Sequence, residues 1–446
     1  MLQQVKSFDR VTVGASLSDR NFVSMMRFFH FVLESPRDGF ESVFGYTRLR
    51  FYQYYTSTAI AVCQNSPNDL RAIDRILPNL VRAIQCAAAS GDHFVVSETV
   101  LCLSAGMDFF TMRNLERESM ALLELAIAAS KHLGDRDRES AAIGHLGTAY
   151  ARLGMIRNAV EHYERALAIA RETGNDGDLA SHLHNLGSTL LSEARDLPRA
   201  ERLLHEALAA AKHSQNVDVV IGCFSALGSL HRQVGNLTEA ARLYAGALEA
   251  ARLAENRLAE GNSLSNLGLV TDQLGDAAEG ERMIRDALAI AIEIGDKRGE
   301  GNRTGHLGGI LLAKATRLPP GPEQSGALES ARGHVATAMR IAEETGDAQK
   351  AGSWLMNLGH VCLLEGNGVE GIRQFEAELR VAEVGGFALL EAQARFNIGS
   401  VMARQGQLQS ALGHFRASSA LLRKMGSPIA AQAEAYVTRL SEMLKS

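Results

Sequence analysis

The sequence predicts an all-α fold, an α-α superhelix built from helix-turn-helix repeats. One marker is a Leu-Gly or Ile-Gly pair that recurs in steps of 40, 41, 40, 40, 51 and 40 residues, with its glycines at Gly147, Gly187, Gly228, Gly268, Gly308, Gly359 and Gly399. A second marker, usually alanine, recurs in steps of 41, 40, 40, 51, 40 and 40 residues at Ala166, Ala207, Ala247, Ala287, Ala338, Glu378 and Ser418. Alternating strand patterns are missing. Two markers that share one period and one irregular step indicate a repeat array with a continuous core.

Residues 257–296 represent one repeat, and their pattern predicts two helices of about 18 residues each. At 100° per residue, Leu264, Leu267 and Gly268 fall on one face of the first helix. Gly275-Asp276 separates the helices, because glycine tolerates the left-handed conformation that ends a helix and aspartate caps the next one. Since such a hairpin cannot bury its apolar faces alone, it needs copies of itself on both sides.

Composition and charge exclude several classes of protein. The chain carries 46 basic and 51 acidic residues, a formal net charge of −5, and no basic run, which argues against direct binding of nucleic acid. Its five cysteines are far apart and form no Cys-x-x-Cys pair, as expected in a reducing compartment. No apolar run reaches the roughly 18–20 residues of a membrane span, and the N-terminus has no signal-peptide pattern. We therefore expect a cytoplasmic protein without a nucleic-acid or membrane partner.

Four regions follow from the composition and the repeats. Residues 1–55 hold eight of the 16 phenylalanines, so we expect an aromatic-rich helical cap, with a docking surface for another domain as the alternative. Residues 56–135 are expected to form degenerate helical repeats, residues 136–426 seven regular repeats, and residues 427–446 a C-terminal capping helix. Residues 318–326 contain three prolines and account for the 11 extra residues of the long step, which predicts an enlarged, exposed turn.

The residues of the first regular repeat carry a family resemblance. Leu146-Gly147 and Tyr150, followed by Ala159, Tyr163 and Ala166, resemble the tetratricopeptide repeat pattern. The 40-residue form is similar to the repeats of kinesin light chains, of Leu-Gly-Asn-type polarity adaptors, and of the C-terminal arm of bacterial signal-transduction (NB-ARC/STAND-type) ATPases. The chain has no Gly-x-x-x-x-Gly-Lys-Ser/Thr loop, so it resembles such an arm without a nucleotide-binding core of its own.

The resemblance also indicates a binding face, because the first helices of such repeats line the concave side of the superhelix. The position two residues before each marker glycine, which we call the groove register, then faces the groove. It reads His145, Asn185, Ala226, Asn266, His306, Asn357 and Asn397. An asparagine amide both donates and accepts hydrogen bonds, so it can hold the backbone of an extended peptide. The alternative is that these amides bond locally to their own helix or to the next repeat.

Further polar side chains are predicted to face the groove, with Arg152, Arg232 and Arg404 as cations and Gln273 as an additional amide. We find no His-Glu-x-x-His motif, no Gly-x-Ser-x-Gly elbow and no other catalytic or metal-ligating pattern. We therefore expect a protein that is not an enzyme and has no cofactor or metal site. The predicted function is a scaffold or sensor arm that binds a peptide or partner protein, in signalling or regulation. The alternative is a receptor arm for a small effector in a regulatory ATPase-type system.

Overall fold

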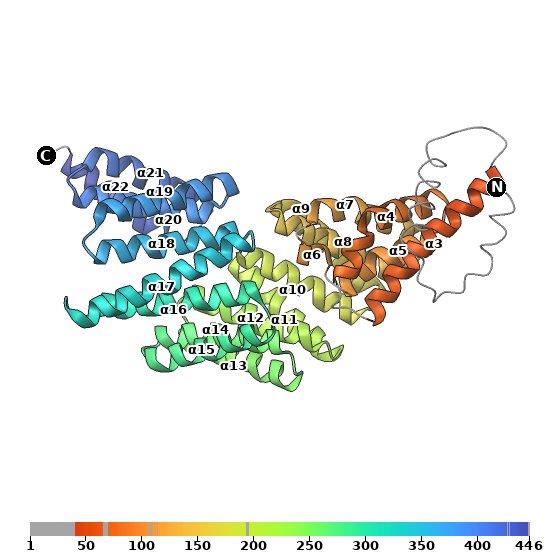
Figure 1. Cartoon of the computed structure of the whole chain (residues 1–446), viewed down its shortest axis with the longest axis horizontal. Helices are drawn as coiled ribbons and strands as arrows, with labels where there is room; N and C mark the ends of the chain where they lie inside the picture. The colour runs from red at the N-terminus through yellow and green to blue at the C-terminus, as the bar shows by residue number, and fades with distance from the viewer. Residues whose placement is uncertain are drawn as a thin grey trace, which may run out of the picture. The chain divides into compact units, whose positions relative to one another are not determined.

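The computed structural model describes residues 41–65, 70–106, 109–113, 115–192, 196–425, 427 and 429–444. In these residues the secondary structure is helical throughout, without strands. Residues up to Gly154 and residues from Met155 onward form two compact units (Figure 1). The first unit contains α3 (Glu41–Asn65), α4 (Leu70–Ala89), α5 (His93–Leu101), a short π-helix (Cys102–Gly106), α6 (Phe109–Arg113), α7 (Glu116–Leu133) and α8 (Arg136–Arg152). The all-α prediction is confirmed.

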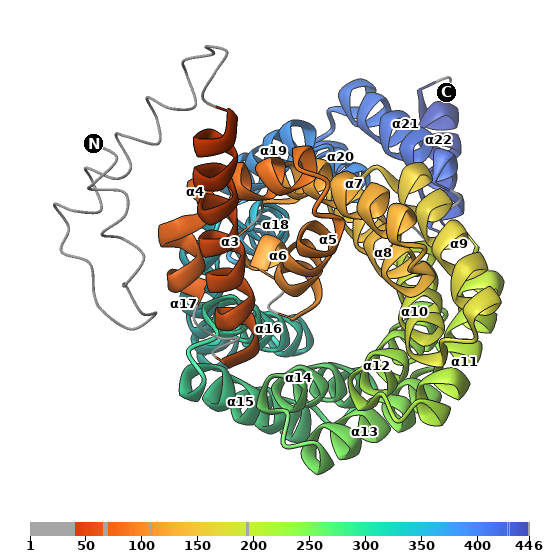
Figure 2. The ribbon, with the colours of Figure 1, turned by 90° about the vertical axis from the view of Figure 1, so that its right-hand side faces the viewer.

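The second unit continues the array of hairpins. Its helices are α9 (Ile156–Thr173), α10 (Asp176–Ser192), α11 (Leu197–His213), α12 (Val217–Gln233), α13 (Leu237–Leu253), α14 (Arg257–Gln273), α15 (Ala277–Glu293), α16 (Lys297–Arg317), α17 (Pro322–Glu344), α18 (Ala348–Leu364), α19 (Gly368–Gly385), α20 (Ala388–Arg404), α21 (Leu408–Lys424) and α22 (Ala430–Met443). Figure 2 shows that these hairpins follow a curve. The first helices α10, α12, α14 and α16 lie on its inner side, and their second helices on its outer side.

The ends of the helices follow the predicted pattern. In the representative repeat, α14 ends at Gln273, and Gly275 takes a left-handed φ of 107°. The Asp276 side chain then accepts a hydrogen bond from the Glu279 backbone N–H and caps α15. This N-cap satisfies a backbone donor that has no partner inside the helix. The same kind of cap begins α16 at Asp296 and α18 at Asp347.

The marker glycines let the two helices of a hairpin approach closely. A Cβ atom added at Gly268 of α14 would lie 2.8 Å from the carbonyl oxygen of Gly280 in α15. At Gly228, an added Cβ would lie 2.8 Å from the ring of Tyr244, which is buried in α13. Because real side-chain atoms do not come this close, any larger residue here would push the helices apart.

The two ends of the array are only partly described. Residues 1–40 of the predicted N-terminal cap lie outside the described residues, and the remainder of that region begins α3. Within the first unit, the Tyr52 hydroxyl donates a hydrogen bond to the Asp92 carboxylate, 3.2 Å away, which links α3 to the start of α5. At the other end, Ala433 and Leu440 of α22 are buried against α21. None of the described helices combines the length and apolar character needed to cross a membrane.

The structure corrects the extent of the predicted insertion. We expected an enlarged turn over residues 318–326, but the turn comprises only residues 318–321, and α17 begins at Pro322. Proline is well tolerated there, because the first turn of a helix needs no backbone donor at that position. Most of the extra residues lengthen the hairpin instead: α16 has 21 residues and α17 has 23, against 17 in each helix of the preceding hairpin.

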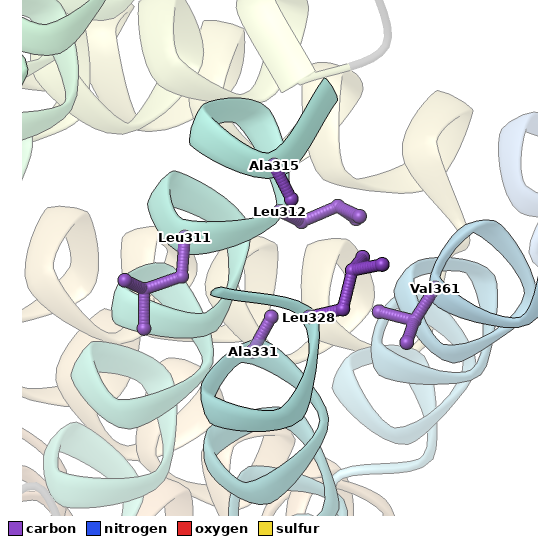
Figure 3. Close-up of a cluster of buried hydrophobic side chains, with 6 residues drawn as sticks. All are labelled: Leu311, Leu312, Ala315, Leu328, Ala331 and Val361. Atoms are coloured by element: carbon purple, nitrogen blue, oxygen red, sulfur yellow. The ribbon is translucent and has the colours of Figure 1, made fainter. Parts of the chain in front are cut away.

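The lengthened hairpin has a hydrophobic core of its own, shown in Figure 3. Leu312 and Ala315 of α16 pack with Leu328 and Ala331 of α17 and with Val361 of α18. The Gln324 side chain donates hydrogen bonds to the carbonyl oxygens of Ala315 and Leu318 at 3.0 and 3.2 Å, which ties the start of α17 to the end of α16.

We predict that Leu328→Ala lowers the free energy of unfolding by about 2–5 kcal/mol, because it leaves a cavity among buried side chains. Chemical denaturation followed by circular dichroism measures the change. The matched control is Glu329→Ala on the exposed side of the same helix turn, which should unfold like the unmodified protein. Equal stability of the two variants would show that the extension does not belong to the core.

One of the two departures from alanine at the second marker is an ionisable residue. In α19, Glu378 occupies the position that is usually alanine, and it is fully buried. Neither of its carboxyl oxygens has a hydrogen-bond partner in the described part of the chain. Burial raises the pKa of this carboxyl to about 8, because the charged form loses its hydration. The group is therefore mostly protonated at neutral pH.

This raised pKa predicts a pH-dependent stability. The folded protein binds the Glu378 proton more tightly than the unfolded chain does, so stability falls as the pH rises from the unfolded pKa of about 4.3 toward the folded value. Glu378→Ala should remove this decline. The free energy of unfolding of the variant, relative to that of the unmodified protein, should rise by roughly 3–5 kcal/mol between pH 5 and pH 8. Denaturation curves of both proteins at several pH values measure the difference in unfolding free energy. A difference that does not change with pH would contradict burial of the Glu378 carboxyl.

Candidate functional site

Six of the seven groove-register residues belong to the second unit, and the seventh, His145, belongs to α8 of the first unit. We call the side of α10, α12, α14, α16, α18 and α20 that is turned away from their second helices the inner face of the second unit. In α14, Gly268 packs against α15, so Asn266, about 200° away around the helix, points to the opposite side. Contacts between neighbouring first helices also lie near this face. The Ser265 hydroxyl is 3.0 Å from Nδ1 of His306, and Arg303 Nη2 donates to the Asn262 side chain at 2.9 Å.

The asparagines of the groove register differ in whether their amides are occupied. Asn185 is engaged within its own helix, since its Oδ1 lies 3.3 Å from Nδ1 of His184. Asn266, Asn357 and Asn397 are half-buried, and their side-chain amides make no hydrogen bond to any described residue. The alternative of local bonding therefore holds for Asn185 alone. Three amides at one register remain able to donate to and accept from a ligand.

The two histidines of the register are uncharged at neutral pH. Burial lowers the pKa of His145, in the first unit, to about 4. In the second unit, burial lowers the pKa of His306 to about 3, and three nearby cations add to the shift: Lys350, Arg303 and Arg232. A neutral imidazole offers one donor and one acceptor, so His306 contributes a hydrogen-bonding group without a charge.

The predicted groove cations also fall into two groups. Arg152, in the first unit, forms an ion pair with the largely buried Glu116 of α7, so its charge is already compensated. Arg232 and Arg404 are exposed, and neither forms an ion pair with a described residue. The Arg404 charge contributes, after burial, to lowering the pKa of His360. Gln273, at the end of α14, is exposed and has no hydrogen-bond partner among the described residues.

Sequence reasoning missed two buried side chains beside the groove register, Arg303 and Trp354. They occupy the position five residues before the marker glycine, where the other first helices carry Ala142, His182, Cys223, Ser263 and Ala394. All seven residues at this position are buried. An arginine and the only tryptophan of the chain, in a register of mostly small residues, are the signal that could have identified this part of the array.

Two glycines create the room for these side chains. A Cβ added at Gly299 would overlap the Arg303 guanidinium and the Asp296 carboxylate. The Arg303 side chain donates to Asp296 at 3.4 Å and is only 3% exposed. A Cβ at Gly305 would overlap the indole ring of Trp354, so the ring packs closely against α16 at this glycine. Without these glycines neither side chain could occupy its position.

Trp354 also joins α16 to α18. Its ring meets the His306 ring edge-on, with 5.9 Å between centroids, and Nζ of Lys350 lies 5.9 Å from the indole centroid. Trp354 and Lys350 line a crevice between α16, α17 and α18, together with Asn302, Ile341 and Thr345 among others. The indole Nε1 donor is buried and has no acceptor in the described part of the chain.

The inner face therefore offers amides, a neutral imidazole and cations, a set suited to binding. Among the described residues, no three or more His, Cys, Asp or Glu side chains are placed to hold a metal ion together. A nucleophile activated by a neighbouring base is not part of the arrangement described above. What the face can do chemically is pair with the polar backbone and the charged groups of a ligand.

Solved structures of other proteins share the fold. A Rap protein complexed with Competence and Sporulation Factor is similar at a TM-score of 0.57, with 14% identity over 84% of this chain and 98% of that one. A signal-transduction ATPase with a tetratricopeptide repeat sensor, from Pyrococcus horikoshii, gives 0.53 with 14% identity, over 92% of this chain and 56% of that one. The quorum sensor NprR from B. thuringiensis gives 0.52 with 13% identity, over 81% and 94%.

Sequence comparison identifies the repeats directly. The family model described as Tetratricopeptide repeat matches residues 118–213, 223–293 and 349–424, more than half of the chain. No curated protein matches the sequence. The periodic hairpins, their close-packed glycines and this match agree, and the chain belongs to the tetratricopeptide repeat family.

Proposed function

We propose that the protein is a non-catalytic scaffold or sensor arm that binds an extended peptide, or an extended segment of a partner protein, along the inner face of residues 155–446. The observation that carries the proposal is the set of unoccupied amides at one register, Asn266, Asn357 and Asn397. An extended peptide presents a backbone donor and acceptor at regular intervals, and a row of amides can pair with both.

The relatives of similar fold support a regulatory setting. The Rap protein is complexed with Competence and Sporulation Factor, NprR is a quorum sensor, and the repeats of the Pyrococcus horikoshii ATPase are described as a sensor. Each of these roles belongs to that protein. For this chain we infer the corresponding class of role, binding coupled to signalling or regulation inside the cell.

The size of the crevice favours a peptide over a small effector. The crevice beside Trp354 has a cavity volume of about 10 Å³, about the room of one water molecule, whereas sites for drug-sized molecules hold about 300–1,000 Å³. The crevice is therefore too small to hold a small effector, the alternative function.

We predict that Asn266→Ala combined with Asn357→Ala weakens peptide binding by about two or more orders of magnitude. Each lost amide leaves a peptide group without its partner, at about 1–3 kcal/mol each. Stability should hardly change, because alanine is favourable in a helix. The ligand is a heptapeptide selected by display on the full chain, and isothermal titration calorimetry with a melting curve measures both effects.

The matched control is Arg282→Ala with Arg373→Ala on the outer helices α15 and α19. Both arginines are at least 60% exposed and pair only with residues of their own helix, so neither binding nor melting should change. Unchanged binding by the asparagine variant would reject the inner face as the binding site. Early melting of that variant would assign the amides to the framework between repeats.

A further inference from the structure

The last described helix, α22, carries a row of large apolar side chains that are exposed. Ile429, at its N-cap, Tyr436 and Met443 are 47%, 39% and 50% exposed. They recur every seven residues, which is about two turns of an α-helix, so they lie on one face of α22. We call these three residues the end stripe. Exposed apolar side chains that adjoin one another mark a contact surface more often than scattered ones do.

The packing of α22 shows that the end stripe continues the groove register. In each of the six first helices of the second unit, the residue three positions before the groove register and the residue four positions after it are buried. In α22, Ala433 and Leu440 are buried at these same two spacings from Tyr436. Because equal spacing on a helix means an equal direction, Tyr436 occupies the groove register of α22. The row of register residues therefore passes from Asn397 to Tyr436.

Contacts between aromatic rings place Tyr436 beside Asn397. The Tyr436 ring meets the Phe396 ring edge-on, with 5.2 Å between centroids, and stacks on the Phe415 ring of α21 at 5.0 Å. Phe396 directly precedes Asn397 in α20. The side chains at the equivalent two positions of α14 and α16 are also in contact, 3.0 Å apart. The ring of Tyr436 is thus held next to the last amide of the groove register.

The end stripe does not lie where a further helix of the array would pack. In the preceding hairpins, the second helix packs on the side of the marker glycine, two residues after the groove register. In α22 that position is Thr438, and one turn later on the same side are Ser441 and Glu442. Thr438 and Glu442 are exposed, and polar side chains there suit contact with water. The apolar side chains of α22 are instead exposed on the side of the groove.

The charges around the end stripe are mostly positive. Residues 388–446 contain seven basic and three acidic residues, whereas the whole chain has a formal net charge of −5. Two of the three acids already pair with arginines. Arg439, one turn after Tyr436, and Arg404, at the end of α20, are exposed and form no ion pair with a described residue. This end of the groove is therefore complementary to an acidic ligand.

We propose that the end stripe binds a large apolar side chain of an acidic, extended peptide, next to the peptide unit that pairs with Asn397. Tyr436 and Ile429 would cover the apolar side chain, and Arg439 would pair with a neighbouring carboxylate of the peptide. A half-exposed tyrosine ring is well suited to this role, because it offers a large contact area and loses little conformational entropy. This inference rests on the proposed function, because it names the chemistry of the ligand in that groove.

The experiment begins with random heptapeptides displayed on phage. The library is first depleted on the Ile429→Gln/Tyr436→Gln variant, which removes peptides that bind without the end stripe, and is then selected on the unmodified full chain. The recovered peptides should share a large apolar residue with acidic residues near it. The matched control is depletion on Val369→Gln/Val384→Gln, which replaces two exposed apolar residues of α19. This depletion should remove the same peptides, because they bind the control variant as well.

Isothermal titration calorimetry with a recovered peptide then gives the size of the effect. Replacing the apolar residue of the peptide by alanine should weaken binding to the unmodified protein about ten- to a hundredfold, because the burial of that side chain is lost. The double variant should bind the two peptides alike, within about twofold. Tyr436→Phe keeps the ring and should bind like the unmodified protein. Ile429→Gln alone lies outside the ring contacts, should give an intermediate loss, and serves if the double variant does not fold.

The outcomes separate this inference from the function on which it rests. If direct selection yields peptides but none remain after depletion on the double variant, the end stripe is overturned and the peptide-binding groove stands. Recovered peptides without acidic residues would overturn the acidic ligand. Self-association of the unmodified chain that the double variant abolishes, measured by analytical ultracentrifugation, would assign the end stripe to a second copy and overturn the inference. If direct selection yields no peptide above background, the proposed function fails and this inference fails with it.

Discussion

Each hairpin depends on its neighbours to cover its apolar surface, and the structure of the array follows from that dependence. The cluster formed by Leu248, Leu264, Ala287 and Ile290 draws on α13, α14 and α15, so it exists only when two hairpins are stacked. Burying such side chains stabilises the stack by about 1.5–3 kcal/mol per large side chain. The stacking turns every first helix the same way. A residue type that recurs at one register therefore forms a row of side chains along the inner face.

The repeat pattern was sufficient to predict most of this fold, because it reflects local rules. Steric limits place glycine where two helices are close, and hydrogen bonding places aspartate or asparagine where a helix begins. Both rules can be recognised in the sequence of a single repeat. The predicted stop at Gly275 and cap at Asp276 are both present. The insertion was judged by its prolines alone. That reasoning failed because Pro322 stands where a helix accepts proline, and Leu312 of α16 and Leu328 of α17 give the lengthened helices a core.

The candidate site was predicted less completely, since it depends on contacts between distant residues. Asn266, Asn357 and Asn397 could be found from their register, because an unoccupied amide needs only the right helix face. The engagement of Arg152 by Glu116 could not be found, because the two residues are 36 positions apart and belong to different helices. A local sequence pattern predicts the helix face on which a side chain lies, whereas the tertiary structure determines which charged side chains are neighbours.

In the proposed function, the inner face offers a peptide two kinds of surface. Amides address the backbone, which every peptide has, and so contribute affinity without selecting a sequence. The neutral His306 ring and the indole of Trp354, which lies 5.9 Å from Nζ of Lys350, form a partly apolar part of this face, where a charged group of a ligand is less screened than in water.

Site-specific photo-cross-linking tests the central claim, that ligands bind along the inner face, most directly. A photoreactive amino acid would replace Gln273, seven residues after Asn266 on the same side of α14, and in a second protein Arg282 on the outer side of α15. Our account predicts that a peptide selected on the full chain becomes covalently attached to the first protein and not to the second. Attachment at position 282 without attachment at position 273 would contradict it.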